Sequence, residues 1–198
     1  MKKLVNALEH IGYLTINASY PSTQHPIEKL AKDVITKALL DCPKEAKINF
    51  VTHSMGGILV RQYLSHHTIK NMGRVVMLGP PNKGSHLVDR FGRLFAFKMI
   101  NGPAGLQLGT HQQSVPNTLG AVDFELGIIA GTRSINPILS HMIPKPNDGK
   151  VSVDSSKVSG MTDHIELPVT HSFMMNHQTV IAQVIYFLAF GFFKKNAN

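Results

Sequence analysis

The sequence predicts an α/β protein, with a mostly parallel sheet and helices on both of its faces. Short runs rich in β-branched residues alternate along the chain with segments of helical periodicity, and several of these runs are almost wholly apolar, as strands buried on both faces are. The 198 residues are 43% hydrophobic and 16% charged. This composition excludes a disordered chain, a collagen-like repeat and a charged coiled coil, and the length suits a single domain over residues 1–198.

Periodicity predicts the elements of the first half. Residues 12–20 read as a strand, and residues 27–39 carry apolar side chains at the i, i+3, i+4, i+7 spacing of an amphipathic helix. Residues 48–52 predict a second apolar strand that runs directly into His53-Ser-Met-Gly-Gly. A helical stretch over residues 58–67 follows it.

The second half repeats the alternation. Residues 74–79 and 124–131 predict a third and a fourth strand, and residues 164–169 a fifth. An apolar helix over residues 180–193 closes the chain. Because strands joined through helices are parallel, their carboxyl ends should share one edge of the sheet.

A longer connection, residues 80–122, separates the third and fourth strands. It contains a helical pattern followed by a loop rich in Gly, Pro and Gln. One interpretation is a crossover helix with a surface loop. The other is a cap or lid over residues 86–120, beside an active site, whose apolar side chains would line a pocket for an acyl group: Phe91, Phe95, Phe97, Met99 and Leu106.

Charge and cysteine content restrict the partners. Lys and Arg exceed Asp and Glu by 20 to 12, a net charge of +8. The basic residues are scattered and accompany no nucleic-acid-binding motif, so no nucleic-acid partner is expected. Cys42 is the one cysteine, which excludes an intramolecular disulfide and a cysteine-based zinc site. The sequence implies no metal and no organic cofactor, and it predicts no oligomeric state.

Targeting signals are not evident. Asn6, Glu9 and His10 interrupt the amino-terminal apolar run before it reaches the length of a secretory signal. The most apolar stretch, residues 180–193, is shorter than the roughly 20 residues of a spanning helix. If the chain is complete as given, a cytoplasmic location is expected.

The junction after the second predicted strand has the features of a nucleophile elbow. Ser54 lies between a strand and a helix, and Gly56 supplies the small residue that lets the two backbones approach. Thr52 stands where glycine is usual, yet it is still fairly small. Ser54 would project its hydroxyl at the carboxyl edge of the sheet, with the Met55 amide facing a developing oxyanion. His53 should point away from Ser54 and serve the packing of the elbow.

A serine nucleophile needs a carboxylate and a base, which in this type of sheet follow on later loops in the order acid, then histidine. Asp148 follows the fourth predicted strand, and His171 follows the fifth. Both therefore occupy the expected loops. The alternatives are Asp154 and Asp163 for the acid, and His164 and His177 for the base.

Three motifs in this order resemble those of bacterial α/β-hydrolase lipases and esterases, near their lipase and GPI-inositol-deacylase-like branch. The motifs are Val51-Thr-His-Ser-Met-Gly-Gly, Asn147-Asp-Gly-Lys-Val-Ser-Val and Leu167-Pro-Val-Thr-His-Ser. The resemblance extends over about residues 1–193, and residues 79–85 look like a structural turn of the family. It implies an α/β-hydrolase fold and hydrolysis of a carboxylic ester, or of a thioester or amide. Ser54 would be the nucleophile, Asp148 the acid and His171 the base.

The sequence departs from the family at its start. Family members normally begin with an apolar strand ending in His-Gly, whose loop supplies the second oxyanion amide, and nothing before Gly12 matches it. We therefore expect an N-terminally truncated hydrolase or, alternatively, a degenerate member. Loss of one oxyanion donor costs roughly 10²–10³ in rate.

Two rival functions follow from the same residues. The incomplete oxyanion hole suits a non-catalytic binding or interaction protein on a degenerate hydrolase scaffold. The basic surface, with the apolar residues 187–193 followed by Lys194 and Lys195, suits a peripheral membrane contact. The favoured hypothesis remains an ester hydrolase whose substrate carries an apolar acyl or alkyl group.

Overall fold

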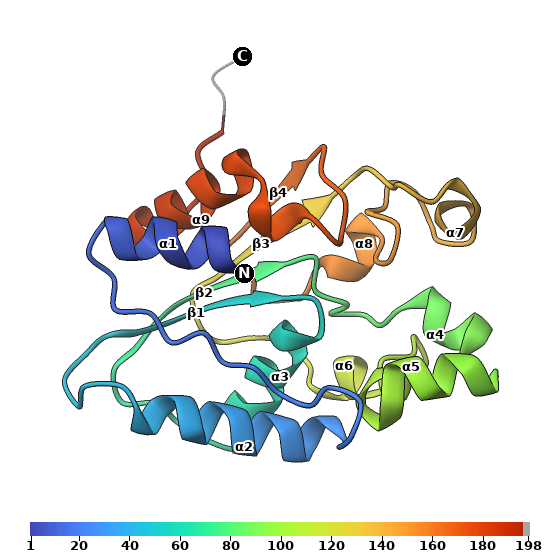
Figure 1. The fold of residues 1–198 in the computed structure, drawn as a ribbon, viewed down its shortest axis with the longest axis horizontal. Coiled ribbons are helices and arrows are strands. Elements are labelled where there is room, and N and C mark those ends of the chain that lie inside the picture. Colours follow the sequence, from blue (N-terminus) through green and yellow to red (C-terminus); the bar gives the residue numbers. More distant parts are fainter. Residues whose placement is uncertain (196–198) are drawn as a thin grey trace.

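A four-stranded parallel sheet organises the computed structural model, which describes residues 1–195 (Figure 1). The strands lie in the order β1-β2-β3-β4, each paired in parallel with the next. Their bounds are β1 (Ile48–His53), β2 (Met72–Leu78), β3 (Leu126–Gly131) and β4 (Asp163–Leu167). The predicted fold class is thus confirmed, and the strands place the elbow and the two later loops at one edge.

Helices cover both faces of this sheet. In chain order they are α1 (Lys2–His10), α2 (Ile27–Leu40), α3 (Met55–Leu64), α4 (His86–Phe91), α5 (Phe95–Leu106), α6 (Val115–Thr118), α7 (Pro137–His141), α8 (Val153–Ser156), the 3₁₀ turn η1 (Met174–Asn176) and α9 (Gln178–Phe190). Figure 1 shows α1 and α9 on one side of the sheet and α2 and α3 on the other.

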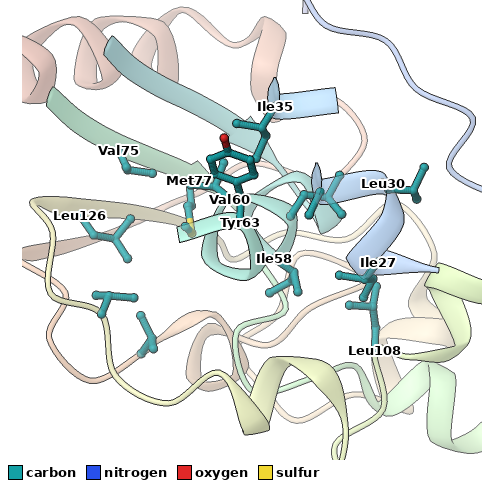
Figure 2. Packing of buried hydrophobic residues seen from close by; sticks show 14 of the residues in the cluster. Ile27, Leu30, Ile35, Ile58, Val60, Tyr63, Val75, Met77, Leu108 and Leu126 are labelled. Carbon is teal, nitrogen blue, oxygen red and sulfur yellow. The ribbon is translucent and has the colours of Figure 1, made fainter. Parts of the chain in front are cut away.

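Alternate side chains of the strands fill two cores. On β2, Val75 and Met77 pack with α2 and α3, whereas Val76 and Leu78 pack with α1 and α9. Figure 2 shows the first of these cores, in which strand and helix side chains meet. Burial of an aliphatic side chain contributes about 1.5–3 kcal/mol. The apolar strands are therefore stabilised by helices that pack on both faces of the sheet.

The prediction of a strand over residues 12–20 is wrong in the described chain. This segment is extended, but no ladder joins it to a neighbour. From Leu14 to Ser19 no backbone N–H donates to another backbone carbonyl within residues 1–195. The segment runs beside β1, but a cavity lies between the two and keeps their backbones from pairing.

The connection between β2 and β3 contains three short helices, α4 to α6. Leu94, Phe95, Met99 and Ile100 are 55–77% exposed on α5 and at its start. Phe91, Phe97 and Leu106 are half-buried. The cap over residues 86–120 stays a prediction, since exposed apolar side chains suit either a surface helix or a substrate-facing one.

The carboxyl-terminal helix belongs to the core. Phe187 and Phe193 are fully buried, whereas Phe190 and Phe192 are more than half exposed. Phe190 and Phe192 are the exposed large side chains of the apolar end that could contact a membrane, and the contact itself stays a prediction. No helix among residues 1–195 combines the length and the apolarity that crossing a membrane requires.

Candidate active site

Ser54 occupies a strained turn between β1 and α3. Its φ of 54° and ψ of −127° make it the one non-glycine residue with positive φ among residues 1–195. Such a conformation costs on the order of 1 kcal/mol or more and persists only where the surroundings enforce it. Here the Ser54 N–H donates to the Leu78 carbonyl oxygen at 2.9 Å, which holds the turn against the end of β2.

Small residues allow this turn to close. A Cβ atom added at Gly56 would lie 3.3 Å from the Cβ of Thr52, and one at Gly57 would lie 2.8 Å from the Met77 sulfur. Threonine at position 52 therefore fits without a clash, although its buried hydroxyl has no hydrogen-bond partner. Met55 begins α3, where the first amides have no acceptor within the helix, so its N–H is available to an oxyanion.

The structure brings Ser54, His171 and Asp148 into one hydrogen-bonded chain. His171 Nε2 lies 3.0 Å from Ser54 Oγ, and His171 Nδ1 lies 2.7 Å from Asp148 Oδ2. His171 and Asp148 are only 3% and 2% exposed. With the proton on Nδ1 donated to the carboxylate, Nε2 can accept the hydroxyl proton of Ser54. This geometry allows an imidazole to activate a hydroxyl nucleophile.

Two loops fix the acid and the base. The second carboxylate oxygen of Asp148 accepts from the amides of Lys150 and Val151 at 2.9 and 2.8 Å. The His171 amide donates to the Asp148 carbonyl oxygen at 3.0 Å. Because backbone groups hold the carboxylate, its orientation toward the imidazole does not depend on flexible side chains.

The alternative acids and bases lie elsewhere. Asp154 pairs with Lys83 at the surface, and Asp163 accepts from the amides of His164 and Phe193. His164 Nε2 lies 3.3 Å from Ser156 Oγ. His177 precedes α9, exposed to solvent. In the described part of the chain, none of the four bonds to the side chain of Ser54, Asp148 or His171.

Gly79 is a site residue that the sequence reasoning treated only as part of a structural turn. It has a φ of 53°, and a Cβ there would lie 2.9 Å from Asp148 Oδ2 and 3.1 Å from His171 Nδ1. Glycine thus leaves room for the carboxylate and imidazole to meet. The sequence feature that could have indicated this role is the position of Gly79 directly after β2, the strand next to β1.

His53 supports the loop of the base. Its Nε2 lies 2.9 Å from the backbone oxygen of His171, and the two imidazole rings are 4.7 Å apart. Burial lowers the pKa of His53 from about 6.5 to about 4, and the neighbouring His171 adds to this shift. The neutral ring donates its Nε2 proton to the carbonyl of His171. His53 thus packs in the elbow, as expected, and also holds the loop that carries His171.

This pKa shift predicts a pH dependence of stability. The unfolded His53 gains a proton below about pH 6.5, whereas the folded one stays neutral until about pH 4. The free energy of unfolding should therefore fall as the pH drops through this window, by on the order of 3 kcal/mol at most, and be unaffected above it.

Urea denaturation at pH 7.5 and pH 4.5 checks this expectation. The native chain should lose more stability between the two pH values than the His53→Gln variant, which keeps a donor but cannot titrate. Asp148 and Lys150 also influence His53 and are common to both proteins. Equal losses in the two proteins would contradict the assignment.

Two hollows open on the molecule, and one of them borders the site. One of about 630 Å³ reaches His53 and Gly56, on either side of Ser54. A hollow of about 500 Å³ lies between α4 and α7 and is lined by Arg90, Pro137, Ile138, His141 and Met142. No cluster of three or more metal-ligating side chains occurs among residues 1–195.

Solved structures of known proteins are similar to this chain. The mature lipase BlEst2 of Bacillus licheniformis shares 18% identity at a TM-score of 0.66, over 96% of this chain and 83% of that one. The phospholipase PlaB of Legionella pneumophila shares 18% at 0.64, over 91% and 53%. The lipase of Staphylococcus hyicus shares 13% at 0.60, over 87% and 81%.

The chain thus spans most of mature BlEst2 but 47% of its propeptide form and about half of PlaB. No family model matches the sequence, and no curated protein matches it. At 13–18% identity, similarity of structure establishes the fold alone. Together with the parallel sheet and its two helical layers, it shows that this chain has an α/β-hydrolase fold.

Proposed function

We propose that the chain is a serine hydrolase that cleaves carboxylic esters through Ser54, His171 and Asp148. The observation that carries this proposal is the continuous hydrogen-bonded chain, 3.0 Å and 2.7 Å long at its two links, which ends on a serine in a strained turn. The similar structures are named as two lipases, a phospholipase and a metagenomic carboxyl esterase. These names support the same class of reaction.

The reaction has two halves. Nε2 of His171 takes the Ser54 hydroxyl proton while Oγ attacks the ester carbonyl carbon, and the carbonyl oxygen becomes an oxyanion that the Met55 amide stabilises. Collapse breaks the bond to the alcohol oxygen, which leaves with the proton from His171. Water then attacks the acyl-enzyme with the same base, and release of the carboxylic acid returns the proton to Ser54. Asp148 orients the imidazole and stabilises its cation throughout.

The proposed substrate carries an apolar acyl or alkyl group. Two helices that follow β2 and β3, α5 and α7, expose large apolar side chains to solvent. Their exposed fractions are 67–77%, and the residues are Phe95, Met99, Ile100 and Ile138. Together they offer a substrate an apolar surface. The hollow between α4 and α7 is lined by Pro137, Ile138 and Met142 together with Arg90 and His141. The resemblance to the lipase and GPI-inositol-deacylase-like branch favours a lipid-like ester as the substrate.

Hydrolysis of p-nitrophenyl esters with acyl chains of two to twelve carbons tests the proposal. We expect turnover by the native chain that rises with acyl length and is lost in Ser54→Ala. Ser65→Ala is the matched control, since Ser65 lies exposed at the far end of α3. A folded native chain that is no faster than its Ser54→Ala variant would favour the non-catalytic binding protein instead.

A further inference from the structure

Arg61 carries a buried charge that the proposed reaction does not use. It lies on α3, the helix that begins directly after the nucleophile, and it is only 3% exposed. No salt bridge joins it to a carboxylate among residues 1–195, and its Nε has no hydrogen-bond partner there. Burial lowers the pKa of Arg61 to about 10, so the guanidinium keeps its charge at neutral pH. A buried charge without a counter-charge is costly, so the acceptors around it have to compensate.

Oxygen atoms from two loops surround the guanidinium. Nη1 donates to the backbone oxygen and to Oδ1 of Asn82, both at 3.1 Å. Nη2 donates to the Gly120 carbonyl at 2.7 Å, a main-chain acceptor that any residue would supply. Hydrogen bonds from a charged donor are stronger than neutral ones, and the planar guanidinium fixes the directions of its acceptors. Arg61 therefore joins α3 firmly to the turn that carries Asn82.

Asn82 extends this connection to α8. Its Nδ2 donates to the Ser156 carbonyl at 2.8 Å, and the neighbouring Lys83 amide donates to the Ser155 carbonyl at 2.9 Å. Asn82 and Ser156 are 2% and 1% exposed, so water does not compete for this bond. One amide side chain thus accepts from Arg61 through its oxygen and reaches α8 through its nitrogen.

The helix α8 is in turn attached to the loop of Asp148. The Val153 amide, at the start of α8, donates to the Pro146 carbonyl at 2.9 Å. Between these two residues the chain forms the loop in which two backbone amides hold the Asp148 carboxylate. A shift of α8 would therefore move this carboxylate relative to the imidazole of His171.

The turn that carries Asn82 also borders the acid and the base directly. Gly79 opens this turn, and a Cβ there would lie 2.9 Å from Asp148 Oδ2. Only Pro80 and Pro81 separate Gly79 from Asn82, and all four residues are buried. Because each proline ring fixes its own φ, the turn is stiff. The guanidinium thus holds one end of a short turn whose other end packs against the acid.

We propose that Arg61 is a positioning residue, which acts through Asn82 to hold the Asp148 loop in the place where the acid meets the base. Its side chain is buried and takes no part in the reaction itself. It connects the helix of the nucleophile to the loop of the acid, two parts of the site that lie far apart in the sequence. The effect on catalysis rests on the proposed function.

Arg61→Met tests the catalytic effect. Methionine fills the apolar space but donates no bond, so the turn of Asn82 can shift, and a shift of about 1 Å at the acid should lower kcat roughly 10–10²-fold. KM should stay within about twofold, because a buried side chain does not bind the substrate.

Arg74→Met is the matched control. The Arg74 guanidinium also donates to backbone carbonyls, those of Leu188 and Ala189, but it lies near the start of β2, away from the carboxyl edge of the sheet. This variant should lose stability and still keep kcat within about twofold of the native value.

Asn82→Ala interrupts the same connection without removing the charge, and it also serves as the test if Arg61→Met fails to fold. It should lower kcat about as far as Arg61→Met does. The double variant should be no slower than the slower single variant, because both substitutions break one connection. Losses of kcat that simply multiply in the double variant would show that the two residues act independently and would contradict the proposal.

The proton between His171 Nδ1 and Asp148 Oδ2 gives a readout that needs no hydrolysis. In a short hydrogen bond to a carboxylate, such a proton resonates in NMR spectra well downfield of the backbone amides, and its loss in Asp148→Asn identifies it. The resonance should move upfield or broaden in Arg61→Met and in Asn82→Ala. It should stay unchanged in Arg74→Met.

The outcomes separate the two proposals. A resonance that changes as expected, in a chain that hydrolyses no ester, would leave the positioning role standing and count against the hydrolase. A native-like resonance and kcat in both Arg61→Met and Asn82→Ala would overturn the positioning role. Equal losses of kcat in Arg61→Met and Arg74→Met would overturn it as well, because the effect would then come from stability alone. A changed resonance with a lower kcat would support both.

Discussion

Replacing His171 with alanine is expected to lower kcat for p-nitrophenyl esters by roughly 10⁶, because no other base lies within reach of the Ser54 hydroxyl in the described chain. Asp148→Asn should cost roughly 10⁴ while leaving the fold intact. The amide can still accept from Lys150 and Val151, but it no longer holds the imidazole in the productive tautomer or stabilises its cation. Steady-state kinetics with matched circular dichroism spectra measure both effects.

The alternatives that the sequence offered are the controls for this prediction. Asp154→Asn removes a surface ion pair with Lys83, and His164→Ala removes a bond to Ser156, neither of which touches the site. Both variants should keep kcat within a few-fold of the native value. Loss of activity in either of them equal to that in Asp148→Asn or His171→Ala would show that the acid or the base has been misassigned.

Gly79→Ala should lower kcat by about 10²-fold or more, although position 79 takes no part in the reaction. The new methyl group would lie 2.9 Å from the Asp148 carboxylate and 3.1 Å from the His171 imidazole, so the pair must separate. A displacement of reacting groups by about 1 Å is sufficient for such a loss. The positive φ adds a backbone cost of about 1 kcal/mol to the free energy of unfolding.

Gly120→Ala distinguishes the contact from the backbone strain. Gly120 has a φ of 66°, close to that of Gly79, but an added Cβ would meet nothing within 4 Å. This variant should lose similar stability and keep its kcat. If both variants lose activity to the same extent, the effect of Gly79→Ala comes from strain in the fold and not from the catalytic pair.

The strands that the sequence predicted well are those whose apolar pattern is strongest. β2 and β3 bury nearly every side chain, so their sequences alone indicate burial on both faces. The loops of Asp148 and His171 followed from the same reasoning, because parallel strands bring the loops at their carboxyl ends to one edge. Chain order and strand position were sufficient to place all three triad candidates.

Contacts between distant segments could not be predicted in this way. Residues 12–20 have the composition of a strand, but a strand also needs a neighbour, and pairing is a property of two segments. The closeness of Gly79 to Asp148, and the bond of His53 to the His171 backbone, likewise arise only when loops separated by many residues meet. A sequence pattern describes each loop and not the distance between them.

The central claim is that Ser54 is an activated nucleophile, and intact mass after fluorophosphonate treatment tests it most directly. The native chain should gain the mass of one adduct, mapped by peptide sequencing to Ser54, while Ser54→Ala and His171→Ala gain none at the same exposure. A folded native chain that stays unlabelled would contradict the account and leave a binding protein on an α/β-hydrolase fold.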